Sequence, residues 1–307
     1  MRGIVTKSTG SWYNVRIENG LTIQCRIKGK IRLQEIKHTN PVTVGDEVNY
    51  ELEAGQETGV IHSVEPRKNY IIRKASNLSK QTHIIASNID QAILVATLSS
   101  PVTSLGFIDR FLVTAEAYHI PAVILFNKAD LLMDEASKEV ATEVIQLYEK
   151  IGYKCIQTSI ISHDGLEELK ALLNNKTSLL SGHSGVGKSS LLNFIDPRLH
   201  LKTGIISNYH QKGQHTTTFA EMHELSFGGF IIDTPGIREF GIVDIEDNEL
   251  SHYFKEIRPY IGQCKFNNCQ HVNEPGCAVI EAVKNHQIAQ ERYFSYLSIL
   301  ANEDLYA

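Results

Sequence analysis

The sequence of 307 residues predicts three structural parts: an N-terminal all-β barrel, a central α/β domain with a parallel sheet, and a small, mostly helical C-terminal domain. Short β-rich runs broken by turn residues fill the first part, and buried strands alternate with amphipathic helices in the second. Cysteines and a histidine gather in the third. The predicted boundaries are 1–66 for the barrel, 67–82 for a linker, 83–242 for the α/β domain and 243–307 for the C-terminal domain.

Composition sets the class of protein. Apolar residues make up 42% of the chain, no run reaches the roughly 18 apolar residues of a membrane helix, and the first residues contain no signal-peptide run. Three of the five cysteines lie within 264–277, which indicates a metal site in a reducing compartment. We therefore expect a soluble cytoplasmic protein without a membrane partner.

The charge is uneven along the chain. The formal net charge is −5, yet residues 1–80 contain 13 Lys and Arg against 8 Asp and Glu. A basic N-terminal part suggests contact with a polyanion, and ordinary surface variation is the alternative.

The N-terminal part predicts strands over 11–17, 21–31, 47–52 and 59–64. In the second run, Ile23, Cys25 and Ile27 alternate with polar and basic residues, which predicts one buried face and one wet, basic face. Several short strands in this length favour a small barrel, with the OB-fold as the leading candidate. Trp12 and Tyr13 are candidates for stacking on bases, and filling the barrel is the alternative.

Residues 67–82 are polar, basic and irregular, which is typical of a linker. The α/β pattern then predicts strands over 92–98, 122–126, 153–158, 177–181 and 230–232, and helices over 105–119, 134–151, 166–173 and 189–195. Such alternation implies a parallel sheet covered by helices on both faces. Near the end of the chain, 278–300 predicts one or two helices.

A phosphate-binding loop follows the strand at 177–181. It fits the pattern G-x-x-x-x-G-K-[ST] and opens a helix. Backbone N–H groups of such a loop approach phosphates, Lys188 would reach the β- and γ-phosphates, and the Ser189 hydroxyl would bind Mg²⁺. The candidate nucleotide-binding residues here are Gly182, His183, Ser184, Gly185, Val186, Gly187, Lys188, Ser189 and Ser190.

A second motif predicts which base is bound. Asn127-Lys128-Ala129-Asp130 follows the strand at 122–126. The Asp130 carboxylate can accept hydrogen bonds from guanine N1–H and its amino group, a donor pair that adenine lacks. Lys128 would pack its stem on the purine and Asn127 would join the two loops. Thr158 and Ser159 complete the predicted guanine pocket, although Ile160 stands where a small residue is usual.

Asp233-Thr234-Pro235-Gly236 lies after the strand at 230–232, with Asp233 placed 44 residues beyond Ser189. Asp233 is expected to hold Mg²⁺ through water, and the Gly236 amide to contact the γ-phosphate. Between these motifs, the loop 211–218 supplies three threonines, of which Thr217 is the candidate Mg²⁺ ligand, with strand entry as the alternative.

The catalytic equipment is sparse. Ile237 follows Gly236, where many GTPases place a water-orienting glutamine, so unaided hydrolysis should be slow. His215 is the nearest candidate for positioning water, beside Lys188 and Thr217 as the other catalytic candidates. Gly185 replaces the asparagine that recruits K⁺ in some GTPases, so the sequence gives no support for K⁺ dependence.

A Cys/His cluster predicts a metal site. Three thiolates and one imidazole without a further carboxylate fit a closed, tetrahedral structural Zn²⁺ site. The candidate ligands are Cys264, Cys269, His271 and Cys277. In so small a domain, the metal would supply much of the folding energy.

The order of the motifs is unusual, because Asn127–Asp130 precedes the phosphate loop, whereas an ordinary GTPase has the reverse order. With this order, the loop 211–218 and the cysteine cluster, the chain resembles the small-ribosomal-subunit-dependent GTPase A family (RsgA, also called YjeQ or YloQ) over essentially its whole length. In the common form of that loop an arginine stands where this chain has Gln214, and the family places its candidate catalytic histidine at His215.

The resemblance implies an OB-fold, a circularly permuted GTPase domain with GTP or GDP and Mg²⁺, and a domain with one structural Zn²⁺. It further implies a monomer that acts late in 30S maturation, binds 16S rRNA beside other assembly factors, hydrolyses GTP with stimulation by the small subunit, and is released on hydrolysis. One alternative is an rRNA-binding module that keeps GTP as a slowly hydrolysed structural ligand. A metabolic P-loop kinase is a further alternative that would leave the guanine motif unexplained.

The rotated order also suggests a mechanical consequence. After Gly236 the chain is free to leave the sheet, and it reaches Cys264 within 28 residues. We expect movement of the 233–236 segment on loss of the γ-phosphate to be passed to the zinc-binding domain.

Overall fold

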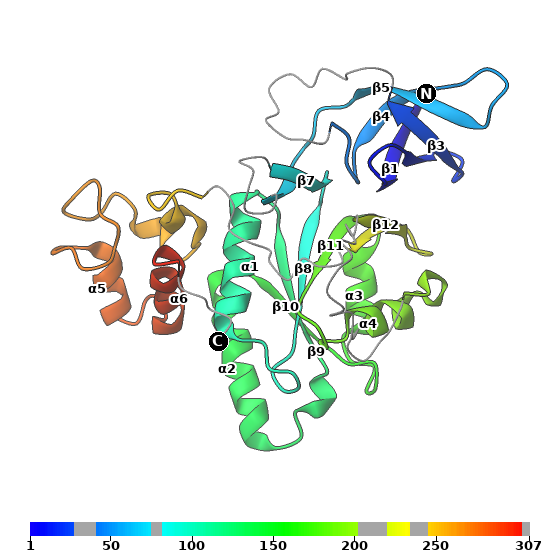
Figure 1. Cartoon of the computed structure of the whole chain (residues 1–307). Helices are drawn as coiled ribbons and strands as arrows, with labels where there is room; N and C mark the ends of the chain where they lie inside the picture. Colours follow the sequence, from blue (N-terminus) through cyan, green and yellow to red (C-terminus); the bar gives the residue numbers. More distant parts are fainter. Residues whose placement is uncertain (28–40, 75–81, 202–219, 234–244, 303–307) are drawn as a thin grey trace, which may run out of the picture. The chain divides into compact units, whose positions relative to one another are not determined.

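The structure is a computed structural model that describes residues 1–27, 41–74, 82–201, 220–233 and 245–302 (Figure 1). The chain forms two compact units. The first contains residues 1–92, 170–181 and 192–239, and the second contains 93–169, 182–191 and 240–307. The domain boundaries that the sequence predicts stay predictions.

A closed five-stranded barrel forms the start of the first unit. Antiparallel pairs join β1 to β2, β2 to β3, β5 to β4 and β4 back to β1, and a parallel pair joins β3 to β5. This closure confirms the predicted OB-fold barrel. Its strands are β1 (Arg2–Ser8), β2 (Tyr13–Ile17), β3 (Thr22–Ile27), β4 (Glu47–Leu52) and β5 (Thr58–Val64). The sequence pattern predicted no strand over the residues of β1.

The side chains of the barrel follow the predicted alternation. In β3, Cys25 is buried whereas Gln24 and Arg26 are exposed. Tyr13 is only 3% exposed and fills the barrel core, so its proposed stacking on bases is wrong and the alternative holds. Trp12 is 40% exposed, and its stacking stays a prediction.

Part of the segment predicted as an irregular linker is a strand. Within 67–82, β6 (Tyr70–Lys74) pairs antiparallel with β7 (Thr82–Ser87). The reason is the apolar pair Ile71 and Ile72, which is buried despite the surrounding charge. Upstream, Arg67 forms a buried ion pair with Asp46, so this segment is also joined to the barrel.

Three further strands of the first unit pair with one another and belong to the same sheet as the barrel strands. β11 (Thr177–Ser181) pairs in parallel with β13 (Phe230–Asp233), which pairs antiparallel with β12 (Glu221–Glu224). β12 was not predicted, and it pairs with barrel strand β1 through Glu221 and Lys7. Asp233 is the last residue of β13.

The second unit contains the base-recognition motif. β9 (Ala122–Asn127) pairs in parallel with β10 (Lys154–Thr158), and β9 is buried throughout, as is β8 (Gln91–Ala96), whose last four residues belong to this unit. Two helices pack on these strands: α1 (Leu105–Ala117) contacts β9, and α2 (Glu135–Ile151) contacts β10. Ser104 and Asp134 cap the N-termini of α1 and α2.

Two shorter helices lie near the unit boundary, α3 (Leu166–Leu173) and α4 (Lys188–Ile195), the latter followed by the 3₁₀ turn η2 (Pro197–Leu199). The C-terminal segment (residues 245–302) contains the 3₁₀ turns η3 (Leu250–Tyr253) and η4 (Arg258–Tyr260), then α5 (Ala278–Lys284) and α6 (Gln290–Leu300). Residues 278–300 thus form two helices. In the described part of the chain, no helix has the length and apolar content of a membrane span.

Candidate functional site

The guanine motif begins where β9 ends. Asn127, the last residue of β9, donates a hydrogen bond from Nδ2 to the carbonyl of Val186 at 2.8 Å and accepts one at Oδ1 from the Thr158 hydroxyl at 3.1 Å. One buried amide therefore joins the base motif, the phosphate loop and the end of β10. Next in the chain, Lys128 takes a left-handed conformation (φ 61°), and Asp130 follows in the 3₁₀ turn η1 (Ala129–Leu131).

The candidate base-reading carboxylate has one described partner. The Ser159 hydroxyl donates to Asp130 Oδ1, and Ser159 Oγ accepts the backbone N–H groups of Ile161 and Ser162 at 3.0 and 3.1 Å. These two backbone donors hold the hydroxyl in place, so Asp130 is oriented before any base arrives. The loop after β9, with Asp130, and the loop after β10, with Ser159, are therefore in contact, and Ile160 follows Ser159 in the second of these loops.

The phosphate loop has the backbone that its glycines require. Gly182, Gly185 and Gly187 have φ values of 140°, 87° and 93°, a region that favours glycine. A Cβ on Gly187 would lie 2.6 Å from Asn127 Nδ2, so the close approach of the two motifs also needs a glycine. Lys188 opens α4 and donates from Nζ to the carbonyls of Gly182 and His183, at 2.5 and 2.9 Å. Its ammonium thus curls back over the loop, where a phosphate bound by the loop would lie.

Sequence reasoning missed a segment that closes on both motifs. Residues 97–104 follow β8, and the carbonyl of Ser100 accepts a hydrogen bond from Lys128 Nζ at 2.8 Å. Pro101 lies beside Gly185, since a Cβ built there would be 3.4 Å from its ring. The available signal was positional: in α/β sheets, ligands bind at the carboxyl ends of parallel strands, where this segment begins.

The other candidate residues of the nucleotide site are placed less completely. Ser189 and Ser190 lie in the first turn of α4, and Asp233 ends β13 as the sequence predicted. The loop 211–218 with Gln214, His215 and Thr217, and the pair Gly236 and Ile237, lie outside the described residues. Their roles therefore stay predictions.

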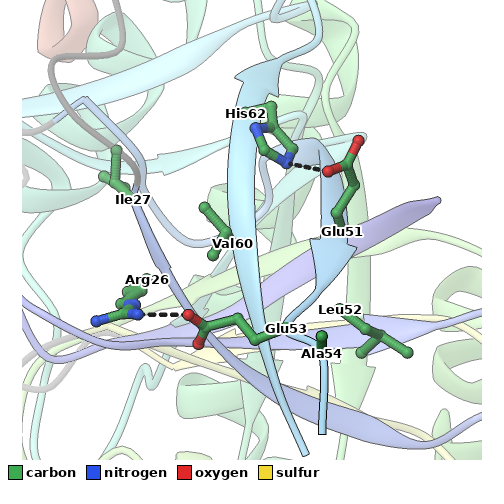
Figure 2. Close-up of a pocket in the computed structure, with 8 residues that line it drawn as sticks. All are labelled: Arg26, Ile27, Glu51, Leu52, Glu53, Ala54, Val60 and His62. Carbon is green, nitrogen blue, oxygen red and sulfur yellow. Dashed lines mark hydrogen bonds and ion pairs between the residues drawn. The ribbon is translucent and has the colours of Figure 1, made fainter. Parts of the chain in front are cut away.

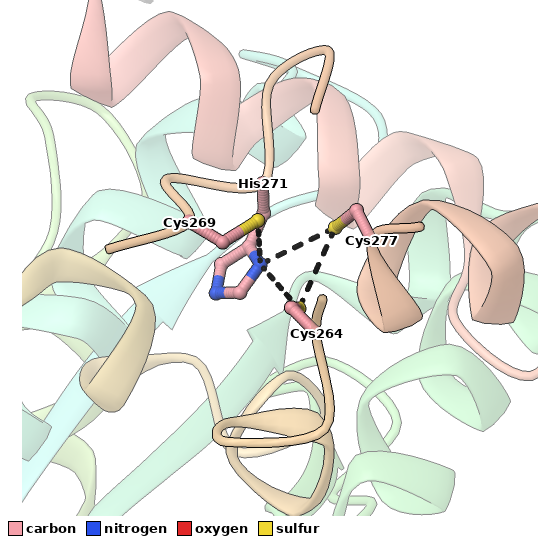
Figure 3. A group of neighbouring side chains, drawn as sticks. All are labelled: Cys264, Cys269, His271 and Cys277. Atoms are coloured by element: carbon pink, nitrogen blue, oxygen red, sulfur yellow. Dashed lines mark hydrogen bonds between the residues drawn. The ribbon is translucent and has the colours of Figure 1, made fainter. Parts of the chain in front are cut away.

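The Cys/His cluster comes together in the C-terminal segment, as Figure 3 shows. His271 Nδ1 lies 3.5 Å from the Sγ atoms of both Cys264 and Cys269 and 3.4 Å from that of Cys277, and the last lies 3.9 Å from Cys264 Sγ. Tetrahedral Zn²⁺ with ordinary bond lengths would separate sulfur from sulfur by about 3.8 Å and sulfur from nitrogen by about 3.6 Å. The four side chains fit one zinc ion through Nδ1 and three Sγ atoms.

Backbone and tyrosine groups fix the shape of this cluster. The hydroxyls of Tyr293 and Tyr296 on α6 each donate at 2.6 Å, to the carbonyls of His271 and Gln270. Glu274 accepts three backbone N–H groups of the turn between the second and fourth ligands. Burial acts to raise the pKa of Glu274, but these N–H groups more than offset it and lower the pKa to about 2. The turn is therefore held by a permanent carboxylate.

The C-terminal segment is joined to α1 and α2 through a buried ion cluster, which we call the Arg292 cluster (Arg292, Asp109, Glu256 and Tyr148). From α6, Arg292 donates to Asp109 of α1 at 2.6 Å and to Glu256 at 2.5 Å. Tyr148 of α2 also donates to Asp109, at 2.8 Å. Burial by itself lowers the pKa of Arg292, but the two carboxylates more than reverse this, so the guanidinium stays charged.

The barrel carries a surface pocket of about 570 Å³ over β3, β4 and β5 (Figure 2). Arg26 pairs there with Glu53, and His62 lies 3.2 Å from Glu51. Elsewhere on the barrel, Arg16 pairs with Glu224. The face that alternation predicts as wet and basic is wet, but carboxylates balance its described arginines.

Comparison with known proteins assigns this chain to a family. The family model described as RsgA GTPase matches residues 64–243, and the model described as RsgA N-terminal domain matches residues 2–61. The chain belongs to the RsgA GTPase family. Membership makes it an enzyme that hydrolyses GTP and confirms the resemblance that the motifs suggested.

Relatives in the RsgA GTPase family align over nearly the whole chain. The Flavobacterium johnsoniae protein "Small ribosomal subunit biogenesis GTPase RsgA" is 54% identical over 99% of this chain and 94% of its own length. A protein of the same name from Phocaeicola vulgatus is 52% identical, over 99% and 97%.

Solved structures agree with the fold. YjeQ from Thermotoga maritima has a TM-score of 0.80 at 40% identity, covering 98% of this chain and 97% of the other. YloQ, described as a circularly permuted GTPase, has a TM-score of 0.75 at 32% identity, covering 98% and 94%. The predicted fold class, including the permuted central domain, is confirmed.

Proposed function

We propose that this GTPase acts in late maturation of the 30S ribosomal subunit. It binds 16S rRNA, hydrolyses GTP to GDP with stimulation by the small subunit, and leaves when hydrolysis is complete. The supporting observation is the match to proteins named for small ribosomal subunit biogenesis over 99% of this chain. On this proposal the protein is a cytoplasmic monomer that works beside other assembly factors.

At the nucleotide site, Asp130 reads guanine and Lys128 covers it, while the N–H groups of Gly182–Lys188 hold the phosphates. Support for the first assignment is the Ser159 hydroxyl, which orients the Asp130 carboxylate. Support for the second is the curled ammonium of Lys188 above the loop. Ser189, Thr217 and, through a water, Asp233 would hold Mg²⁺, which would neutralise charge on the phosphates, and His215 would position the attacking water.

The Cys/His cluster holds one structural Zn²⁺. Among the described residues its donor set has three thiolates and one imidazole, and its interatomic spacings match a closed tetrahedron. A bound zinc ion would fix the turn that Glu274 and Tyr293 already shape. The zinc-bearing segment and the barrel are the two surfaces that hold rRNA.

The presence or absence of the γ-phosphate affects the zinc-bearing segment in two ways. The first is a hypothesis from the sequence: the 233–236 segment, of which only Asp233 lies in the described residues, relays loss of the γ-phosphate along the chain toward Cys264. The Arg292 cluster also joins that segment to α1, which belongs to the same compact unit as the phosphate loop. Loss of the γ-phosphate thereby weakens the grip on the subunit.

A second candidate function is an rRNA-binding module that keeps GTP as a slowly hydrolysed structural ligand. Ile237 favours it, because an aliphatic side chain cannot orient the attacking water. On this reading, nucleotide state would not change the affinity for 30S subunits.

Co-sedimentation with purified 30S subunits tests the proposal. We expect binding to be at least tenfold tighter with a non-hydrolysable GTP analogue than with GDP. An Asp130→Asn variant is the control, since it should lose the difference with guanine nucleotides while keeping its fold. Equal affinity of the unaltered protein in the two nucleotide states would contradict the proposal and favour the second candidate.

A further inference from the structure

The side chain of His183 in the phosphate loop contacts the segment after β8 and helix α1. Its Nε2 lies 2.7 Å from the Thr103 hydroxyl oxygen and its Nδ1 lies 3.1 Å from the carbonyl of Ser184. The ring also meets Phe107 of α1 edge to face, with centroids 5.6 Å apart at 89°. Three contacts on one side chain hold the ring in a single orientation.

The hydrogen-bond partners of His183 decide which of its ring nitrogens carries the proton. The Ser184 carbonyl can only accept, so Nδ1 carries the hydrogen, and Nε2 accepts from the Thr103 hydroxyl. Thr103 Oγ1 in turn accepts the backbone N–H of Thr97 at 2.9 Å, while the Thr103 N–H donates to the Thr97 carbonyl at 2.8 Å. Every hydrogen bond is satisfied when the imidazole is neutral.

Thr103 in turn fixes the segment 97–103, which closes on the base motif. The Thr97 hydroxyl donates to the Pro101 carbonyl, and the Ser100 carbonyl accepts from Lys128 Nζ at 2.8 Å. His183 is therefore joined through buried Thr103 to the carbonyl that holds the Lys128 ammonium. This hydrogen bond fixes the end of the Lys128 side chain, whose stem covers the purine in the proposed site.

We propose that His183 is a positioning residue for guanine nucleotide: it locks the segment 97–103 onto the phosphate loop and so pre-arranges Lys128 over the base. This inference rests on the nucleotide site proposed above. The lock acts on Lys128 over the base, which GDP and GTP share, so it strengthens the binding of both nucleotides. It acts before the chemical step, so it lowers KM and leaves kcat unchanged.

Variants with matched chemistry test the lock. His183→Ala removes both ring bonds, and Thr103→Val removes only the hydroxyl at nearly constant volume. Each should raise the Kd for a fluorescent GDP analogue about three- to tenfold, the usual effect of one lost neutral hydrogen bond. The double variant should be no weaker than the weaker single variant, because both remove the same link. His183→Gln should restore most of the affinity, since its amide can accept from Thr103 and donate to Ser184.

The pH dependence of the Kd gives a further test, because a merely structural role of His183 would not change it. Burial lowers the pKa of His183 below its usual 6.5, and the charges of Lys188 and Lys128 lower it further, against the opposing bond to Ser184. The segment 97–104 contains no titratable side chain. Almost all His183 side chains are thus neutral, the form that we expect to support binding, at pH 7.5. That fraction falls as the pH falls through the lowered pKa. The Kd of the unaltered protein should rise on acidification more than that of His183→Gln, with His62→Gln in the barrel as a control that follows the unaltered protein.

The outcomes separate the two proposals. Additive effects of His183→Ala and Thr103→Val, or an unchanged Kd in His183→Ala, would overturn the role of His183. The proposed nucleotide site would still stand if the unaltered protein binds GDP normally. Failure of the unaltered protein to bind GDP would overturn both. A fall in kcat without a rise in KM would also contradict the lock. Thermal unfolding shows that each variant is folded, and Thr103→Val keeps the test open if His183→Ala is not.

Discussion

Replacing Arg292 by methionine should loosen the attachment of the C-terminal segment more than any surface substitution. Arg292 and Asp109 are both fully buried and the Glu256 side chain is 8% exposed, so the change leaves two carboxylates without a cation. Methionine retains most of the length of the side chain but lacks the guanidinium, whose carbon lies 4.8 Å from the ring centroid of Phe254. The loss therefore comes chiefly from charge rather than from volume.

The expected magnitude follows from burial. Breaking a buried ion pair by removing one partner costs about 3–5 kcal/mol, because the remaining charge has no water around it. For a unit of about 150–250 residues, each kcal/mol lowers the midpoint of thermal unfolding by about 2–4 °C. Arg292→Met should thus lower the midpoint of the second unit by about 6–20 °C.

Lys255→Met is the matched control. Lys255 pairs with Glu116 at 3.1 Å, but its side chain is 30% exposed and Arg258 also contacts Glu116. Removing it should cost no more than about 1 kcal/mol. The assay is thermal unfolding followed by circular dichroism, with hydrogen exchange of α6 to assign the transition.

A triple variant and the pH dependence complete this test. Combining Arg292→Met with Asp109→Asn and Glu256→Gln should recover at least half of the loss, since no charge then remains buried. Burial raises the pKa of Asp109, and Arg292 is the main group that opposes the rise. Without Arg292 the folded-state pKa rises further above its unfolded value, so the deficit is largest at high pH and shrinks as the pH falls. A deficit at neutral or higher pH that is no larger than that of Lys255→Met, or a deficit that grows as the pH falls, would refute the reasoning.

Three further substitutions or treatments test the proposed sites. Asp130→Asn should weaken GTP binding at least a hundredfold and favour xanthosine nucleotides, because an amide presents N–H where guanine also presents N–H; unchanged GTP affinity in a titration would contradict the guanine assignment. Gly187→Ala should weaken GDP binding at least tenfold, because its Cβ would meet Asn127 Nδ2 at 2.6 Å; an affinity equal to that of the unaltered protein would show that the two motifs can separate freely. The purified protein should contain one zinc per chain by elemental analysis, and Cys269→Ser should lose the metal and speed hydrogen exchange in α5 and α6; a metal content near zero in the unaltered protein would exclude the zinc site.

Much of the fold could be predicted from local patterns in the sequence. Alternation and turn residues predicted the barrel strand β3, and the Gly-rich loop between β11 and α4 predicted a phosphate site. Strand β1 was missed because it starts next to the chain terminus with no turn signal before it. Strand β6 was missed because its buried Ile71 and Ile72 stand among charged residues.

Contacts between distant residues could not be predicted in this way. Asp109 and Arg292 are separated by 183 residues, and nothing in the periodicity of α1 marks Asp109 as the charged residue that becomes buried. His183 occupies a variable position of the phosphate-loop pattern, so the sequence offers no reason to pair it with Thr103, 80 residues upstream. Such partners are decided by packing in three dimensions, where charge and hydrogen-bond needs are met across the fold.

We expect this GTPase to need the small ribosomal subunit for rapid hydrolysis of GTP. The most direct measurement is steady-state GTP turnover by the purified protein alone, with 30S subunits and with 50S subunits. We predict slow turnover alone and with 50S subunits, and stimulation of at least tenfold by 30S subunits. Equal turnover in all three conditions, or stimulation by 50S subunits instead, would contradict it.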